Sequence, residues 1–417
     1  MLQVTLVLCC ICLCSGFLTE RKAINPLTLM FGEWLIILFL ASLRLYNILP
    51  ASKDIYHIIF LGLIFYVVGY YCFRIIKIKF KFNHFSTKKL LLDFLSFVSI
   101  VIFFLDALNS LQILLTGGDL KTIREVAQEG NIYNNSILNL LRILVAAPFA
   151  NVLSIIAPVN FFLSKTKNFK LYFYTILIIC LKIISDGSRS IFILFSISCL
   201  ICLVHTNKID FNKIKFVLKK KTWICIVSLV VFLFIIFYLT LSRSGAQSLR
   251  YTYYYFSMEP IMFEKWKNIV DATNFIGYGT ASFNGFLFII FNILSTLFGV
   301  VPSTLWSNSY DFIERVGTDW QIITSNGLTA NSYVTVFFPL YLDGREFGVC
   351  LGMFIFGAFS AILYNQVYTQ LNERNISIYI LVMMSILLSF QLFIFENIYY
   401  SLSFIMLLLI FKKRRFV

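Results

Sequence analysis

Charged residues are scarce in this chain. Only 13% of its 417 residues are Asp, Glu, Lys or Arg, whereas 59% are hydrophobic and 18% are aromatic. A typical soluble domain carries about 25% charged residues. A water-soluble protein of this length could not cover its surface with so little charge. The composition therefore excludes a soluble globular domain and indicates a protein whose main solvent is lipid.

The long apolar runs also lack the polar–apolar alternation of barrel strands. Backbone groups in lipid must be hydrogen-bonded internally, so a spanning segment is either a helix or a strand of a closed barrel. Unbroken runs favour helices. We predict an all-α polytopic membrane protein with about eleven transmembrane helices, near residues 1–18, 27–49, 55–73, 90–115, 136–163, 171–185, 190–205, 222–241, 347–367, 376–395 and 397–411.

Several motifs of soluble enzymes are missing. The sequence has no GxxxxGK[ST], no GxSxG and no HExxH. Histidine is rare, and none of His57, His84 and His205 falls in the segment 242–346. The ten cysteines lie within or beside apolar runs, so we expect neither a disulfide framework nor a metal site. No metal and no cofactor is implied.

The net charge of +15 comes mostly from short basic clusters between apolar runs. Clusters such as Lys219–Lys221 and the terminal KKRR (412–415) fall in alternate loops, which the positive-inside rule places in the cytoplasm. We therefore expect no nucleic-acid partner, an outer N-terminus and a cytoplasmic C-terminus. Three regions are predicted: a bundle of about eight helices over 1–241, a long outer loop over 242–346, and C-terminal spans with a basic tail over 347–417.

The predicted outer loop is rich in aromatic residues, including a tyrosine cluster at 251–255. Such residues suit either the membrane interface or a sugar-stacking surface. Its apolar stretch 283–301 is nearly long enough to cross the membrane, but a crossing would place the KKRR tail outside. We therefore predict an interfacial or re-entrant helix there, closed by Pro302.

Outward-facing arginines are the candidates for binding a phosphate group. Arg189 lies in SDGSRS beside Ser188, at the apex of two short spans, where backbone N–H groups and a guanidinium could meet a pyrophosphate. Arg124, Arg243 and Arg250 lie on the same predicted side. Binding to lipid headgroups is the alternative for each of them.

Ionisable residues inside spans are functional candidates as well, although they could instead extend to the interface. They are Glu33, Arg44, Asp93, Asp106, Arg142 and Lys182. A general base in the outer loop would have to be a carboxylate, because no histidine lies there. The candidates are Asp311, Glu314, Asp319, Asp343 and Glu346.

Several stretches of the chain resemble the oligosaccharide repeat-unit polymerases, the O-antigen polymerase (Wzy) family. They are NPLTLMFGEW (25–34), GSRS (187–190), LSRS (241–244), GYGTASFNGFLFIIFNILSTLFGVVPSTLW (277–306) and NSYVTVFFPLYLDGREFGVCLGMFIFGAFSAILY (331–364). The last stretch departs from the Asp-Phe-Gly that is usual in the family, because it reads Asp343-Gly344-Arg345-Glu346-Phe347-Gly348. Glu346 therefore competes with Asp343 for the catalytic role.

The resemblance implies a glycosyltransferase with a GT-C-like architecture in the bacterial cytoplasmic membrane. Such an enzyme joins undecaprenyl-pyrophosphate-linked oligosaccharides on the periplasmic face, with pyrophosphate as the leaving group and no metal. It implies pyrophosphate binding by the outward arginines and acceptor binding at Asn331 and Tyr333. Tyr254 is a further candidate for contact with the sugar. Partners would be membrane lipid, a chain-length regulator and a flippase of the same pathway.

Two other functions are compatible with a chain of this kind. A flippase for lipid-linked sugars would have short loops and internal repeats, and no repeat is evident in the sequence. An O-antigen ligase would use a histidine in the long loop, which this chain lacks. The polymer formed could be O-antigen or capsule.

Overall fold

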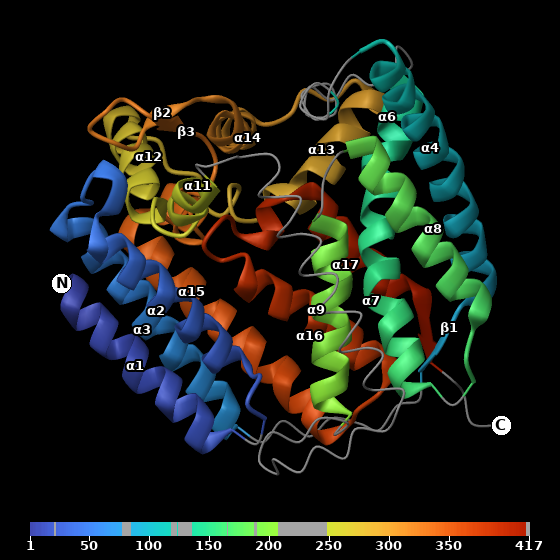
Figure 1. Ribbon diagram of the computed structural model, residues 1–417, viewed down its shortest axis with the longest axis horizontal. Helices are drawn as coiled ribbons and strands as arrows, with labels where there is room; N and C mark the ends of the chain where they lie inside the picture. The colour runs from blue at the N-terminus through green and yellow to red at the C-terminus, as the bar shows by residue number, and fades with distance from the viewer. Residues whose placement is uncertain are drawn as a thin grey trace. The chain divides into compact units, whose positions relative to one another are not determined.

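The computed structural model describes residues 1–20, 22–76, 85–117, 123, 136–164, 166–186, 190–206 and 248–413, and most of these residues are helical (Figure 1). In chain order the longer helices are α1 (Leu2–Thr19), α2 (Pro26–Leu43), α3 (Lys53–Ile75), α4 (Lys89–Leu115), α6 (Ser136–Leu141), α7 (Ala147–Leu163), α8 (Phe169–Asp186), α9 (Ser190–His205), α11 (Ser248–Tyr255), α12 (Glu259–Thr273), α13 (Asn284–Phe298), α14 (Thr304–Thr318), α15 (Phe337–Thr369), α16 (Glu373–Leu387) and α17 (Ile398–Ile410).

Shorter elements connect these helices. They are the 3₁₀ turns η1 (Leu45–Asn47) and η4 (Ile394–Glu396), the π-helical turn η2 (Arg142–Ala146), and the strands β1 (Phe85–Thr87), β2 (Gln321–Ile322), β3 (Thr329–Ala330) and β4 (Phe411–Lys413). β1 pairs with β4 and β2 pairs with β3, both antiparallel. None of these strands was predicted from the sequence.

Six helical segments of the described residues are long and apolar enough to cross a membrane: Leu2–Thr19, Pro26–Leu43, Lys53–Ile75, Lys89–Leu115, Leu138–Leu163 and Phe337–Thr369. Three further apolar helices, Ser190–His205, Asn284–Ser295 and Ile398–Ile410, are shorter. The chain is thus a helical membrane protein. The predicted span at 222–241 lies outside the described residues.

The chain forms two compact units, and each unit is assembled from separate stretches of sequence. Unit 1 consists of Met1–Lys79, Lys215–Asn365 and Val382–Asn397, and unit 2 of Phe80–Ile214, Gln366–Leu381 and Ile398–Val417. The helices of the predicted outer loop therefore fold in the same unit as α1–α3 and most of α15.

In unit 1, α3 and α15 pack at backbone contact because of glycines. A Cβ atom on Gly69 would lie 2.1 Å from the carbonyl oxygen of Phe354, and one on Gly357 would lie 2.1 Å from that of Tyr66. No other residue type fits at this separation. Small residues that let helices approach closely are the usual basis of helix association in membranes.

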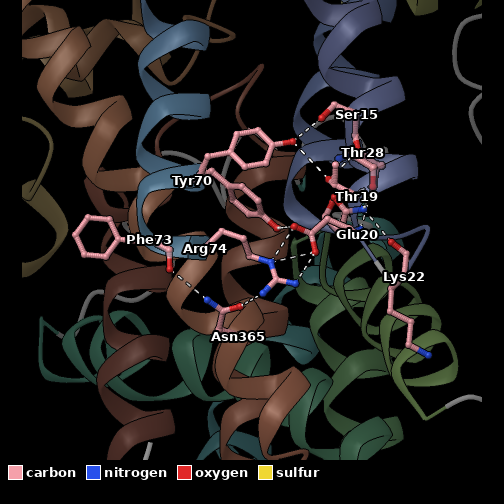
Figure 2. A network of polar contacts seen from close by, with 12 residues as sticks. Ser15, Thr19, Glu20, Lys22, Thr28, Tyr70, Phe73, Arg74 and Asn365 are labelled. Carbon is pink, nitrogen blue, oxygen red and sulfur yellow. Dashed lines mark hydrogen bonds and ion pairs between the residues drawn. The ribbon is translucent and has the colours of Figure 1, made fainter. Parts of the chain in front are cut away.

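A polar network ties the ends of α1 and α3 to α15 (Figure 2). Arg74 donates through Nε to Glu20 Oε1 at 2.9 Å and through Nη2 to Glu20 Oε2 at 3.0 Å, and it also bonds Asn365. Tyr70 donates to Glu20 at 2.9 Å, and Asn365 donates to the carbonyl oxygen of Phe73. The carboxylate of Glu20 is buried but fully paired, as a charge in this environment must be.

The stretch 283–301 contains the helix α13, whose 15 residues run from Asn284 to Phe298. It ends at Phe298 because Gly299 takes the left-handed conformation, with φ of 63°. The prediction that Pro302 closes this helix was therefore wrong. α12 packs Phe263 and Trp266 onto α15, with ring centroids 6.2 Å from Phe337 and 5.8 Å from Phe338 respectively.

Unit 2 is built around α7, which is buried along most of its length. α4 packs against α8, and α7 packs against α9 and α17. β4 contains Lys412 and Lys413 of the basic tail, and Phe85 of β1 lies opposite Lys413.

Candidate functional site

Two distant stretches of unit 1 meet at Asp343. The carboxylate of Asp343 accepts hydrogen bonds from the backbone N–H groups of Ala281 at 2.9 Å and Ser282 at 2.8 Å. The amides of Gly277 and Tyr278 donate to the carbonyl oxygens of Leu342 and Asp343. The loop 277–282 is therefore wrapped around the end of the first segment of α15.

Gly277 is required for this contact. A Cβ atom there would lie 2.6 Å from Oδ1 of Asp343 and 2.9 Å from Oγ of Ser309. The carboxylate of Asp343 already accepts two backbone hydrogen bonds, one on each of its oxygens. This geometry suits a residue that positions the loop better than one that takes a proton.

α15 is broken directly after Asp343. Gly344 and Arg345 have non-helical dihedral angles, and Arg345 takes φ of 57° and ψ of −143°. Such a conformation is costly for a residue with a side chain. Glu346 begins the second segment with an exposed side chain, and the structure records no hydrogen bond or ion pair between it and another described residue. Of the two predicted catalytic carboxylates, Glu346 is the one that is open to a substrate.

Arg345 belongs to a network that joins the break to α12. Its guanidinium lies 3.3 Å from Asp271 Oδ1 and donates to the carbonyl oxygen of Val270 at 3.1 Å. Asp271 also accepts from Tyr341 at 2.8 Å and pairs with Lys267 at 2.6 Å. Burial raises the pKa of Asp271, but the bonds from Lys267 and Tyr341 and the charge of Arg345 outweigh it and hold the pKa below its ordinary value.

This network was not predicted from the sequence. Lys267 and Asp271 are spaced i, i+4 on α12, a signal that could have indicated the ion pair. Nothing in the sequence places Arg345 beside them. With two cations and one carboxylate, the network leaves one positive charge beside Glu346.

Arg250 and Tyr254 are in contact in the structure. Nε of Arg250 donates to the Tyr254 hydroxyl at 2.9 Å, and the guanidinium lies 5.5 Å from the centre of the Tyr254 ring. The Tyr254 hydroxyl donates to the carbonyl oxygen of Tyr46 at 2.8 Å, and its side chain is buried. A buried ring offers no face to a sugar, so the prediction that Tyr254 contacts the sugar is corrected: it anchors the turn at Tyr46.

Asn331 and Tyr333 lie in the turn that leads into α15. Asn331 donates through Nδ2 to the carbonyl oxygen of Gly317 at 2.5 Å and thereby fixes the turn to the end of α14. Tyr333 is half-buried, and its ring centroid lies 5.4 Å from that of Tyr255, the last residue of α11. The remaining predicted pyrophosphate ligands, Arg124, Ser188, Arg189 and Arg243, lie outside the described residues.

Three of the predicted ionisable residues of the spans meet inside unit 2. Arg142 Nε lies 2.9 Å from Asp106 Oδ2, and its Nη2 lies 2.8 Å from Asp186 Oδ1. Lys182 pairs with the other oxygen of Asp186 at 2.5 Å. Two cations and two carboxylates balance, so this network neutralises itself and joins α4 and η2 to α8. Asp93 forms a separate, exposed ion pair with Lys170.

Comparison with protein-family models, with curated proteins and with solved structures finds no match for this chain. Among the residues that the structure describes, no group of three or more His, Cys, Asp or Glu side chains is placed to hold a metal ion.

Proposed function

We propose that this protein is a polysaccharide polymerase that joins lipid-pyrophosphate-linked oligosaccharide units on the outer face of the bacterial cytoplasmic membrane. One observation carries the proposal. The stretches 277–306 and 331–364, on which the resemblance to O-antigen polymerases rests, contact each other at Asp343. In this proposal the chain crosses the membrane about eleven times, with its N-terminus outside and the loop 242–346 in the periplasm.

The proposed reaction assigns separate tasks to the two carboxylates. Glu346 accepts the proton of an acceptor hydroxyl while that oxygen attacks the anomeric carbon of the donor sugar. The bond from that carbon to the pyrophosphate oxygen breaks, and the electron pair leaves with the pyrophosphate. Asp343 holds the loop 277–282 in place, and Arg243 and Arg250, which belong to the same unit, stabilise the leaving group.

Deletion of the gene followed by electrophoresis of the surface polysaccharide tests the function. If the protein is the polymerase, its deletion should leave a single repeat unit on each anchor. Complete loss of surface sugar would instead indicate a flippase or a ligase, and an unchanged ladder of long chains would contradict all three.

The assignment of the carboxylates is tested by Glu346→Gln and Asp343→Asn in purified protein with lipid-linked substrate. Glu346→Gln should lower kcat by about 10²- to 10⁴-fold and leave thermal unfolding unchanged, because its side chain is exposed. Asp343→Asn should lower both activity and the unfolding temperature, because an amide cannot accept both backbone hydrogen bonds equally well. Full activity in Glu346→Gln would remove the base role.

A further inference from the structure

Four aromatic rings from three separate segments of unit 1 form a continuous series, which we call the aromatic shelf. Ring centroids lie 5.4 Å apart between Tyr255 and Tyr333, 5.8 Å between Tyr333 and Phe390, and 5.6 Å between Phe390 and Phe256. Tyr255 is 44% exposed and Phe256 is 39% exposed. Tyr333 and Phe390 are half-buried. The series thus keeps part of its aromatic surface open.

The turn that carries Tyr333 has an unusual backbone. Ser332, Tyr333 and Thr335 have φ of 63°, 59° and 71°, a region that residues with a side chain rarely adopt. Such a conformation is costly for a residue with a side chain, and strain of this kind is concentrated at binding sites. Backbone bonds hold the turn on both sides, from Ser332 to Val316 at 2.8 Å and from Val336 to Ser389 at 2.7 Å. These backbone hydrogen bonds, together with the partial burial of the ring, therefore fix the position of Tyr333.

Two carboxyl groups are linked to residues that adjoin the aromatic shelf in the chain. Ser389, which precedes Phe390, donates to Glu33 Oε2 at 3.2 Å and accepts from Trp34 Nε1 at 2.9 Å. Glu33 is half-buried. Glu259, close to Phe256 in sequence, is fully buried, and neither of its oxygens has a hydrogen-bond partner in the described part of the chain.

These carboxyl groups distinguish the aromatic shelf from an interfacial belt. Tyrosine and tryptophan at a membrane interface need no acid beneath them, and a buried carboxyl without a partner is costly. Sugar rings present C–H faces that stack on aromatic rings and hydroxyls that donate to carboxylates. The combination of open rings and an acid that can accept hydrogen bonds therefore fits a sugar better than it fits an acyl chain.

We propose that the aromatic shelf binds a sugar ring of the oligosaccharide acceptor, with Tyr255, Tyr333 and Phe390 stacking on the ring and Glu33 accepting hydrogen bonds from its hydroxyls. The inference rests on the proposed function and deepens it, because it assigns sugar contact to Tyr255 in place of the buried Tyr254.

Binding is measured with the full chain in lipid nanodiscs by saturation-transfer NMR. The probe is the oligosaccharide that mild acid releases from the surface polysaccharide of the producing cells. Tyr255→Ala and Phe390→Ala should each weaken binding by about tenfold, and Tyr255→Phe should retain it. Tyr251→Ala is the matched control, because Tyr251 is 39% exposed on the same helix but belongs to no ring pair of the aromatic shelf.

Glu33→Gln provides a second measurement that does not remove an aromatic ring. It keeps the shape of the side chain but replaces one acceptor oxygen with an amide group that only donates, so binding should weaken by about tenfold or more while the variant stays folded. Wild-type affinity in Tyr255→Ala, Phe390→Ala and Glu33→Gln alike would overturn the inference. No binding of the oligosaccharide by the wild-type chain would also overturn it.

Failure of this inference can be told apart from failure of the proposed function. If deletion abolishes chain extension but the shelf variants extend chains with wild-type KM, the polymerase stands and the sugar site is wrong. If deletion leaves long chains but the wild-type chain still binds the oligosaccharide and the variants do not, the sugar site stands without the polymerase.

Discussion

Glu259 illustrates how a single residue makes this protein sensitive to pH. It lies at the start of α12, outside the candidate membrane spans, and its carboxyl is fully buried. Burial raises its pKa well above the ordinary value; its own backbone amide lowers it somewhat, and nearby Glu33 raises it further. The folded protein therefore keeps this carboxyl neutral at a pH where the unfolded chain ionises it.

Stability should consequently fall as pH rises above the ordinary pKa of glutamate, about 4.3. Below that value both states bind the proton, so the burial of Glu259 carries no pH-dependent penalty. Between the ordinary and the raised pKa the unfolded state binds fewer protons, which costs up to about 1.4 kcal/mol for each pH unit. Glu259→Gln removes this penalty, so its unfolding temperature relative to wild type should rise between pH 5 and pH 8.

Thermal unfolding in detergent micelles at a series of pH values measures this difference. Glu314→Gln is the control, because it makes the same substitution at an exposed position on α14. A difference for Glu259→Gln that stays constant across the series would show that the carboxyl is ionised in the folded protein.

Tyr254 and Tyr255 show which part of the site could be predicted from the sequence. The tyrosine cluster itself was evident, and its position in an aromatic outer loop suggested either interface packing or a sugar surface. α11 is only 8 residues long, so its periodicity could not show which tyrosine faces inward. The structure buries Tyr254 against Tyr46 and leaves Tyr255 44% exposed.

At the scale of an element, helix α15 begins at a residue that could not be predicted from the sequence. The sequence predicted a span over 347–367. The helix in fact begins at Phe337 and continues past a break at Gly344 and Arg345. Hydropathy detects the apolar second segment, but the first segment is fixed by contacts with α12 and the loop 277–282, which are distant in sequence.

The close packing of α3 on α15 predicts a large effect of a small substitution. Gly69→Ala would place a methyl group 2.1 Å from the carbonyl oxygen of Phe354, which is backbone and cannot rotate away. The helices must separate, and overpacking of this kind typically costs about 1–3 kcal/mol. The unfolding temperature in micelles should fall clearly.

Gly32→Ala on α2 is the matched control for this prediction. A methyl group there would lie 3.7 Å from Leu13 Cδ1, which is ordinary van der Waals contact. Because alanine favours the helix over glycine by up to about 1 kcal/mol, this variant should be neutral or stabilised. Equal unfolding temperatures for the two variants would mean that α3 and α15 do not approach as closely as the structure shows.

At the scale of the whole molecule, each of the two compact units consists of stretches that are far apart in the sequence. Unit 1 contains the N-terminal helices, the helices α11–α14 and the segment Val382–Asn397. The apolar runs predicted most of the individual helices. Their grouping depends on contacts such as those of Ser389 with Trp34 and of Arg74 with Glu20, which join residues far apart in the chain.

The β2–β3 hairpin offers a direct test of the proposed orientation. Its turn, residues 325–327, is exposed, and the hairpin is held by backbone bonds from Leu49 to Ile323 at 2.9 Å and from Ser325 to Asn47 at 3.0 Å. An epitope inserted after Asn326 should therefore leave the fold intact. In the proposed orientation this region lies outside, so antibody should bind the epitope on intact spheroplasts, while a tag after Val417 should be detected only after lysis. Detection of the C-terminal tag alone on intact spheroplasts would reverse the orientation and place Glu346 and the aromatic shelf on the cytoplasmic side, where the proposed polymerisation could not occur.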